Sequence, residues 1–278
     1  MLTKNDIKAL AKKYGFTPQK RLGQNFLIDV NVRDKLLKYA DFSKDDVLLE
    51  IGAGLGQLTF ECSKIAKKVI VVEFDKKLFS ILAQLAQDFT NIVLVQGDFL
   101  EFDFKEFIQK DKKIKIISNL PYSISTPIIL KLFAHHEYIS SSILTLQKEV
   151  ADRLVAKPAS KAYSSLTLLA EFYSQIKRFF NISKNSFYPM PKVDSTVIFL
   201  QMRETPPVEV TNKNDLFDLI RAGFSTRRKT LLNALLAQHY KGFSKERIEE
   251  ILTAAGIAHN ARAETLRLSD FAKIVNLI

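Results

Sequence analysis

The stretch V-L-L-E-I-G-A-G-L-G, residues 47–56, is a short apolar run that ends in three closely spaced glycines. The apolar run predicts a buried strand, and glycines directly after a strand let the chain turn tightly and approach a ligand closely. A dinucleotide fingerprint would require a further glycine at position 57, which is Gln57, so binding of a nicotinamide dinucleotide is disfavoured. Taken alone, the stretch fits both a nucleotide-like ligand and an ordinary strand–helix junction.

Four more apolar runs follow this strand, and helical patterns lie between them. They are V-I-V-V-E (69–73), I-V-L-V (92–95), I-K-I-I-S-N (114–119) and I-L-T-L-Q (143–147). Strands that alternate with helices predict a doubly wound α/β domain with a mainly parallel, Rossmann-like sheet. We expect S-T-V-I-F-L-Q-M (195–202) to close this sheet, whereas Y-S-S-L-T-L-L-A-E-F-Y-S-Q-I (163–176) fits either a strand or a helix.

A change of pattern near residue 207 predicts a domain boundary. The Pro pair in T-P-P-V-E-V (205–210) favours an extended linker, and the residues beyond it have helical periodicity. We therefore expect one domain over residues 1–207 and a small all-helical domain over residues 208–278. Ser244 and Ser269 each precede a helical pattern and are the expected N-caps of two of its helices.

Two acidic residues stand at or just after the next two predicted strands. The Glu73 carboxylate can accept both ribose hydroxyl protons of an adenosine-containing ligand. Asp98 can accept a hydrogen bond from an adenine amine, with Phe99 beside the ring. Either residue alone could be a surface acid, but the carboxyl ends of parallel strands meet at one cleft. Together with the glycine cluster, the two acids predict a single binding site.

The fourth strand ends in S-N-L-P-Y, residues 118–122, and this motif indicates the chemistry. The amide oxygen of Asn119 can accept a hydrogen bond from an exocyclic amine, and a carbonyl just before or at Pro121 can accept the second proton. Proline stiffens the turn, and Tyr122 offers a ring on which a base can stack. The motif could also be a simple turn, since Asn and Pro are turn residues, but its place at a strand end favours binding of an adenine amine.

In this order along the chain, these motifs resemble the ribosomal RNA adenine N6-dimethyltransferase family, and above all its small-subunit branch. The motifs that carry the resemblance are G-Q-N-F-L (23–27), E-I-G-A-G-L-G (50–56), Glu73, G-D-F (97–99), N-L-P-Y (119–122) and F-Y-P-M-P-K-V-D-S (187–195). Q-K-E-V-A-D-R-L (147–154) and F-S-T-R-R-K-T-L-L-N (224–233) are similar to that branch as well. The resemblance extends over about residues 19–268.

The resemblance implies a class I methyltransferase that uses S-adenosylmethionine, releases S-adenosylhomocysteine and needs no metal. The implied donor contacts are Asn25, Leu27, Gly52, Glu73, Asp98 and Asn119. The implied catalytic residues that hold the target adenine are Asn119, Leu120, Pro121 and Tyr122, with Phe187 over the other face of the base. The implied substrate is a pair of adjacent adenosines near the 3′ end of small-subunit (16S) rRNA, each methylated twice, within an immature ribosomal particle. Without the resemblance, Q-N-F-L (24–27) predicts the start of an amphipathic helix.

The charge of the chain agrees with a polyanionic partner. The formal net charge is +11, and the first 40 residues contain nine Lys or Arg against three Asp. Such a basic surface suits a nucleic acid, although a merely solvated surface explains it equally well. The expected phosphate contacts are Lys20, Arg21, Arg227, Arg228 and Lys229, with the last three at the start of a helix. Because cations at a helix N-terminus oppose the helix dipole, that position favours phosphate binding over mere exposure.

Composition disfavours several other classes of protein. The single cysteine, Cys62, cannot form an internal disulfide or a zinc site alone and is expected in the core. The four histidines lack metal-ligand spacing, and no apolar run is long enough to span a membrane. The amino terminus lacks the apolar stretch of a secretory signal. We therefore expect a protein of the cytoplasm with no membrane partner, and the resemblance implies a monomer.

Three other functions stay open from the sequence. An erythromycin-resistance-type methyltransferase of large-subunit rRNA would have nearly the same core, although F-S-T-R-R-K (224–229) favours the small-subunit branch. A DNA adenine methyltransferase would more often have an acidic residue in place of Asn119. A non-catalytic assembly factor would need only the basic surface and no donor site.

Overall fold

The computed structural model describes residues 2–108 and 112–278, and it divides into two compact units. The first contains Met1–Ala151 and Lys177–Met202, and the second contains Asp152–Ile176 and Arg203–Ile278. Residues 152–176, which the sequence analysis assigned to the first domain, group with the second unit because helix α8 (Ser165–Tyr173) packs against α9 (Lys213–Gly223) and α12 (Leu268–Val275).

The first unit contains a seven-stranded sheet in the order β4-β3-β2-β5-β6-β9-β7. The strands are β2 (Val47–Ile51), β3 (Lys68–Glu73), β4 (Ile92–Gln96), β5 (Ile114–Asn119), β6 (Ile139–Gln147), β7 (Ser174–Ile182) and β9 (Ser195–Met202). The first five in chain order pair in parallel, and β9 pairs antiparallel to β6. All five predicted parallel strands are therefore confirmed, within a doubly wound α/β fold.

The edge of the sheet differs from the prediction. Strand β9 lies between β6 and β7 and does not close the sheet, because β7 occupies the edge position. The stretch at residues 163–176, which fitted either structure, forms the helix α8 and then enters β7. Only Ser174 and Ile182 are buried along β7, so this strand lacks the continuous apolar run that identified the central strands.

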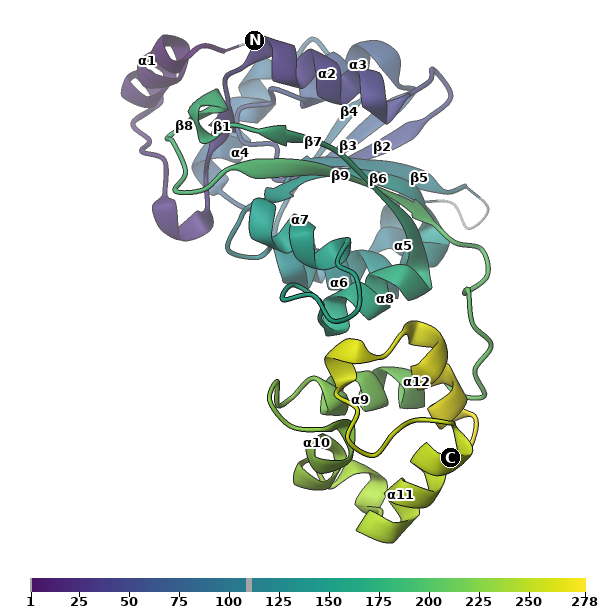
Figure 1. Ribbon diagram of the computed structural model, residues 1–278. Helices are drawn as coiled ribbons and strands as arrows, with labels where there is room; N and C mark the ends of the chain where they lie inside the picture. Colours follow the sequence, from purple (N-terminus) through teal and green to yellow (C-terminus); the bar gives the residue numbers. More distant parts are fainter. Residues whose placement is uncertain (1, 109–111) are drawn as a thin grey trace. The chain divides into compact units, whose positions relative to one another are not determined.

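Helices cover both faces of the sheet. Figure 1 shows α2 (Val30–Ala40) and α3 (Thr59–Ile65) on one face, and α5 (Phe104–Phe107) and α6 (Ser125–Ala134) on the other. The core on the first face joins side chains of α2, α3 and α4 (Lys76–Leu85) to the strands. Cys62 lies in this core with no exposed surface, as the sequence predicted, and burial raises the pKa of its thiol.

The N-terminal segment forms a separate two-stranded sheet with a later part of the chain. Helix α1 (Lys4–Tyr14) precedes a short turn, η1 (Lys20–Leu22), and then β1 (Phe26–Leu27) pairs antiparallel with β8 (Phe187–Tyr188). The helix predicted from Q-N-F-L alone is therefore wrong in position. Helix α2 begins at Val30, because the Asp29 side chain caps it by accepting hydrogen bonds from two backbone N–H groups.

The second unit is helical, as predicted. Besides α8, α9 and α12 it contains α10 (Leu231–Ala237) and α11 (Lys245–Ala254). Ser244 caps α11, where its side chain accepts a hydrogen bond from Arg247 N. Ser269 is not a cap, because α12 already begins at Leu268 and Asp270 Oδ2 accepts from Arg267 N. In the described part of the chain, no helix is both long and apolar enough to cross a membrane.

Candidate functional site

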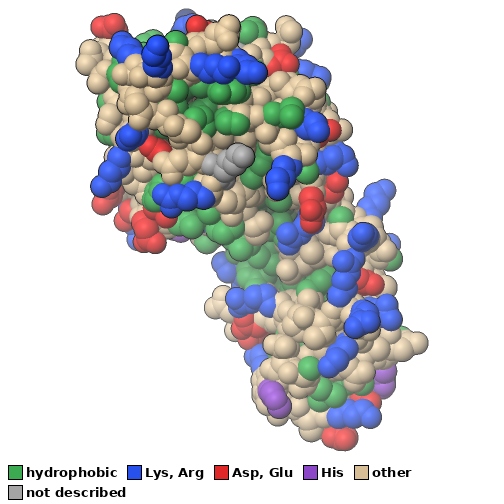
Figure 2. Space-filling model, turned by 90° about the vertical axis from the view of Figure 1, so that its left-hand side faces the viewer, with side chains coloured by type: hydrophobic (Ala, Val, Ile, Leu, Met, Phe, Trp, Pro, Cys, Tyr) green, Lys and Arg blue, Asp and Glu red, His purple; other side chains and the backbone are tan. Residues whose placement is uncertain are grey.

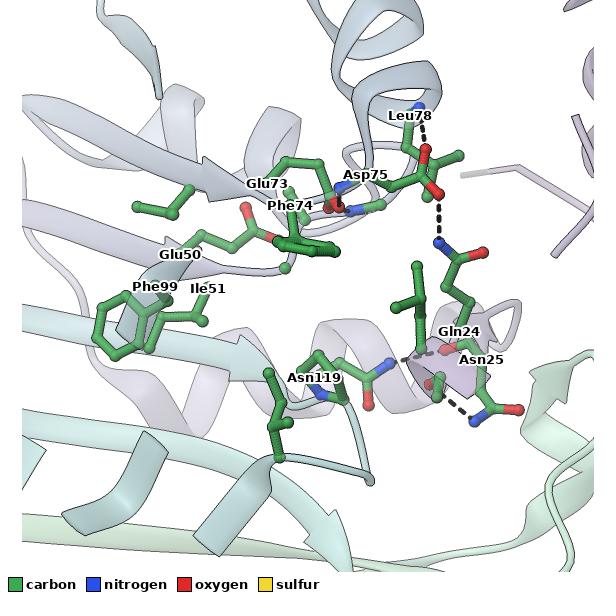
Figure 3. A pocket seen from close by; sticks show the side chains of 18 of the residues that line it. Gln24, Asn25, Glu50, Ile51, Glu73, Phe74, Asp75, Leu78, Phe99 and Asn119 are labelled. Carbon is green, nitrogen blue, oxygen red and sulfur yellow. Dashed lines mark hydrogen bonds between the residues drawn. The ribbon is translucent and has the colours of Figure 1, made fainter. Parts of the chain in front are cut away.

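A pocket of about 290 Å³ lies in the first unit at the carboxyl ends of its parallel strands. Residues at or just after four of these strands line it, namely Gly52, Glu73, Asp98 and Asn119. These strands, β2 to β5, are neighbours in the sheet, so their ends converge on one cleft. Figure 3 shows the side chains that project into this space from both the strand ends and the N-terminal segment. The convergence that the sequence predicted is present in the structure.

The glycine loop after β2 is packed so closely that side chains do not fit. Gly54 has φ +59°, and a Cβ atom there would lie 2.9 Å from the Phe26 ring. Gly56 has φ +79°, and its Cβ would lie 2.4 Å from the ring of Phe60. Positive φ values favour glycine, and both contacts are far shorter than van der Waals distances. The loop therefore needs glycine at both positions to curve around the pocket.

Glu73 ties this loop to the end of β3. Its Oε2 accepts a hydrogen bond from Gly54 N at 2.8 Å, and its Oε1 accepts one from Asp75 N at 2.8 Å. The side chain is 5% exposed, and burial raises its pKa. Each carboxylate oxygen has lone pairs for a further donor, so Glu73 can bind hydroxyl groups of a ligand while it holds the loop.

Glu50, which lies within the glycine motif but was not predicted as a site residue, is a second buried carboxyl group in the pocket. Its side chain is 2% exposed, lines the pocket and accepts a hydrogen bond from Thr59 Oγ1 at 2.5 Å. Burial, with a smaller contribution from the charge of Glu73, raises the pKa of Glu50 to about 8. At neutral pH this carboxyl group is therefore largely protonated in the ligand-free protein.

Glu50→Gln should raise the melting temperature of the ligand-free protein at alkaline pH. The Glu50 pKa rises from 4.5 to about 8 on folding, so the folded state holds the proton more tightly and loses stability as pH rises through that window. The amide has no proton to lose, so the gain should be near zero at about pH 4.5 and roughly 5–10 °C at about pH 8.5. Thermal melts at the two pH values measure this difference. Equal gains at both would show that ionisation of Glu50 is not the cause.

Asp98 follows β4 and lines the pocket beside Gly97 and Phe99. Its Oδ1 accepts a hydrogen bond from Leu100 N at 2.8 Å, which caps the short helix η2 (Phe99–Glu101). The Phe99 ring is 3% exposed. Asp98 is thus held by its own turn, beside the Phe99 side chain, and its role as the acceptor for an adenine amine stays a prediction.

Asn119 lies at the end of β5, and only one of its two polar side-chain atoms has a hydrogen-bond partner in the described part of the chain. Its Nδ2 donates to the backbone oxygen of Asn25 at 2.9 Å. Its Oδ1 is buried and accepts no hydrogen bond within the described part of the chain. Because a buried acceptor without a donor is costly, Oδ1 is suited to accept a hydrogen bond from a bound group. The contact also brings Asn25 and Asn119 together, although 94 positions separate them.

Two glutamines and Asp75 form a contact that the sequence analysis missed. Gln24 Nε2 donates to Asp75 Oδ2 at 3.0 Å, and Gln19 Nε2 donates to the same atom at 3.1 Å. Asp75 Oδ1 accepts hydrogen bonds from Lys77 N and Leu78 N and so caps α4; Figure 3 shows the bond from Leu78. Asp75 directly before a helical pattern is a recognisable capping signal, but no local signal connects it to the N-terminal segment.

The other predicted catalytic residues are not all at the pocket. Pro121 lines it, whereas Leu120 is 1% exposed and does not line it. The Tyr122 hydroxyl lies 2.5 Å from Ser195 Oγ. Phe187 is 2% exposed and belongs to the core on the α2–α3 face of the sheet. Neither Tyr122 nor Phe187 lines the pocket in this structure.

The predicted phosphate contacts fall in two groups. In the first unit, Arg21 lines the pocket and its Nε donates to Gln19 Oε1 at 3.2 Å, and Lys20 begins the η1 turn. In the second unit, the three basic residues at 227–229 are exposed. The sequence predicted that these three residues begin a helix, and this is wrong. Thr230 caps α10, and the helix starts at Leu231. They lie in the turn between α9 and α10.

Arg227 is the best anchored residue of this turn. Its Nη2 donates to the Lys161 backbone oxygen at 2.6 Å, and its Nε lies 3.7 Å from a Glu264 carboxylate oxygen. On the face shown in Figure 2, Lys and Arg side chains are spread over both units. In residues 2–108 and 112–278, no cluster of three or more His, Cys, Asp or Glu could hold a metal ion.

Comparisons with known proteins identify the family of the chain. The family model "Ribosomal RNA adenine dimethylase" matches residues 15–278. The ribosomal RNA small subunit methyltransferase A of Bacillus pumilus (strain SAFR-032) is 41% identical over 276 residues, covering 98% of this chain and 94% of that protein. The protein of the same name from Oceanobacillus iheyensis is 39% identical over 279 residues, covering 99% of this chain and 95% of the relative.

Two solved structures also match the chain, at lower sequence identity. The crystal structure of a dimethyladenosine transferase from Plasmodium falciparum matches with a TM-score of 0.76 and 29% identity, covering 90% of this chain and 95% of that chain. The 23S rRNA methyltransferase ErmE matches with a TM-score of 0.67 and 23% identity, covering 91% of this chain and 99% of its own. At that identity, the second match shows a shared fold alone.

Proposed function

Because the chain belongs to the ribosomal RNA adenine dimethylase family, we propose that it methylates N6 of two adjacent adenosines near the 3′ end of small-subunit rRNA, twice each, with S-adenosylmethionine as donor. Its membership makes it an rRNA methyltransferase. The small-subunit substrate is proposed from relatives at about 40% identity that carry that name. The observation that carries the chemistry is the buried, uncommitted Oδ1 of Asn119 at the pocket.

The pocket residues fit such a donor. Asp98 can accept a hydrogen bond from the adenine amine, and Glu73 can accept from the ribose hydroxyls while it retains its two backbone hydrogen bonds. The glycine loop leaves room for the rest of the molecule, and Asn25, Leu27 and Gly52 line the same space. The donor supplies a methyl group on an already activated sulfonium, so the protein needs no strong nucleophile.

Asn119 and its neighbours would then orient the target amine. The Asn119 Oδ1 accepts a hydrogen bond from one amine proton, and its Nδ2 contact with Asn25 O fixes the side chain. The Pro121 carbonyl oxygen already accepts from Ile124 N at 3.2 Å, so the Leu120 carbonyl is the better acceptor for the second proton. Two such hydrogen bonds aim the nitrogen lone pair at the methyl group, which is a positioning effect.

The base must leave its helix to reach this pocket. Tyr122 and Phe187 are the proposed stacking residues, and base–aromatic stacking contributes about 1–3 kcal/mol per base. Since neither Tyr122 nor Phe187 lines the pocket and Phe187 is buried in the core, stacking on both faces of a base requires these side chains to move. A change of their rotamers on RNA binding is therefore part of the proposal.

The proposed setting is an immature small-subunit particle in the cytoplasm, on which the chain acts as a monomer. The basic surface, at a formal net charge of +11, would supply affinity for rRNA phosphates through Lys20, Arg21, Arg227, Arg228 and Lys229. A primer-extension map of both rRNAs from a deletion strain tests the substrate. Loss of a modification near the 3′ end of the small-subunit rRNA supports the proposal. Loss in the large-subunit rRNA, as for an erythromycin-resistance-type enzyme, would overturn it.

Replacing Arg227, Arg228 and Lys229 together by Ala should flatten the salt dependence of RNA binding. Three lost phosphate contacts reduce the slope of log K against log salt by about 2. The control is a triple Ala variant at Arg221, Lys245 and Arg247, which pair with carboxylates of their own helices and should leave the slope nearly unchanged. Equal slopes for the 227–229 variant and the wild type would remove this turn from the RNA interface.

A further inference from the structure

Gln57 has a side chain amide that the fold does not use. Both its Nε2 and its Oε1 are buried and lack a hydrogen-bond partner in the described part of the chain. Gln57 also lines the pocket at the strand ends. Buried polar groups are nearly always paired in folded proteins, so an amide with both atoms unpaired beside a pocket points to a ligand that pairs with them.

The other amide side chains of the pocket are already committed as donors. The side chain nitrogens of Gln24, Asn25 and Asn119 each donate to an acceptor of the protein. Gln57 therefore offers the pocket an amide donor and an amide acceptor on one side chain that are both still available. A ligand group that matches it must itself present an acceptor and a donor close together.

The sheet order indicates which part of the ligand reaches Gln57. The strands run β4-β3-β2-β5, with Asp98 after β4, Glu73 on β3 and Asn119 on β5. A donor with its adenine at Asp98 and its ribose at Glu73 must carry its sulfonium toward Asn119, and its amino acid end then lies over the loop after β2. Gln57 lies in that loop, directly after the close-packed Gly56.

We propose that Gln57 binds the α-amino acid end of the methyl donor. Its Nε2 donates a hydrogen bond to the α-carboxylate, and its Oε1 accepts one from the α-ammonium group. The inference rests on the proposed function, in which the pocket binds S-adenosylmethionine. It deepens that function by assigning the zwitterionic end of the donor to a side chain that the resemblance did not include.

The test compares two ligands that differ only in that end. S-Adenosylhomocysteine has the amino acid group, whereas 5′-methylthioadenosine keeps the adenosine and the thioether but lacks it. Dissociation constants are measured by titration calorimetry for the full chain and for Gln57→Met, which keeps the length of the side chain and removes the amide. Gln84→Met, at an exposed position on α4, is the matched control.

We expect Gln57→Met to weaken S-adenosylhomocysteine binding at least about tenfold, in line with the loss of one hydrogen bond to a charged group. The affinity for 5′-methylthioadenosine should stay within twofold, and Gln84→Met should change neither. An equal loss for both ligands would mean that Gln57 only shapes the pocket and would overturn the proposal. Unchanged binding of S-adenosylhomocysteine to Gln57→Met would overturn it too, with the proposed function intact. If the wild-type chain bound neither ligand, the donor site itself would be wrong, and the Gln57 assignment with it.

Discussion

Asn119→Ala should lower methyl transfer by about 100-fold or more while the chain remains folded. The substitution removes the Oδ1 acceptor that the pocket leaves uncommitted, and also the Nδ2 donor that holds Asn25 O at 2.9 Å. Loss of one preorganised hydrogen bond to a reacting group typically costs on the order of 10²–10³ in turnover. Single-turnover methylation of small-subunit particles measures this rate.

Donor binding must be measured separately for the same variant. Because Asn119 is also an implied donor contact, we expect affinity for S-adenosylmethionine to fall by less than about tenfold, as for one neutral hydrogen bond. Asn119→Asp is a useful second variant. It keeps the acceptor oxygen for the target amine but places a second oxygen against Asn25 O, where the Nδ2 donor was. It should retain more activity than the alanine variant. Wild-type turnover in Asn119→Ala would remove Asn119 from the methyl-transfer step.

Glu73→Gln should lower donor affinity by about 100-fold, the second large effect. The carboxylate accepts the backbone N–H groups of Gly54 and Asp75, one on each oxygen. The amide of glutamine has only one acceptor oxygen, so its NH2 group must face one of these backbone N–H donors. The NH2 group cannot accept a hydrogen bond from a ribose hydroxyl. Hydrogen bonds to a charged group contribute about 1.5–3 kcal/mol each, and each 1.4 kcal/mol is tenfold in affinity.

Equilibrium dialysis with labelled S-adenosylmethionine tests the Glu73 prediction. Gln96→Leu serves as a control, since Gln96 is exposed at the end of the neighbouring strand β4 and does not line the pocket. A melting curve of each variant separates loss of the site from loss of the fold. An affinity within threefold of wild type for a folded Glu73→Gln chain would contradict the role of Glu73 as a ribose ligand.

The central sheet and half of the pocket could be predicted from the sequence because their signals are local. Strands β2 and β3 are continuous apolar runs, and Glu73 and Asp98 stand beside strand ends whose convergence follows from a parallel sheet. The resemblance then supplied Asn25, which no local pattern connects to Asn119. The amphipathic helix expected from Q-N-F-L failed because the pairing of Phe26 with Tyr188 depends on a segment more than 150 residues away.

The features of the fold and the site that could not be predicted from the sequence depend on long-range contacts or on burial. The hydrogen bonds from Gln19 and Gln24 to Asp75 span more than 50 positions. The edge strand β7 is buried only at its two ends and carries Lys177 and Arg178, so its sequence resembles a polar connection. The raised pKa of Glu50 and the unpaired amide of Gln57 arise only once the pocket has formed. The presence of a Glu or a Gln beside a glycine motif does not predict either property.

One measurement tests the central claim, that this row of strand ends presents an activated methyl group to an adenine amine. Purified chain is incubated with methyl-labelled S-adenosylmethionine and small-subunit particles that lack the modification, and the rRNA is then digested to nucleosides. We expect the label in N6,N6-dimethyladenosine with the wild-type chain and, over the same time, about a hundredth of it or less with Asn119→Ala. No label in dimethyladenosine with the wild-type chain, or equal label with both chains, would contradict the claim.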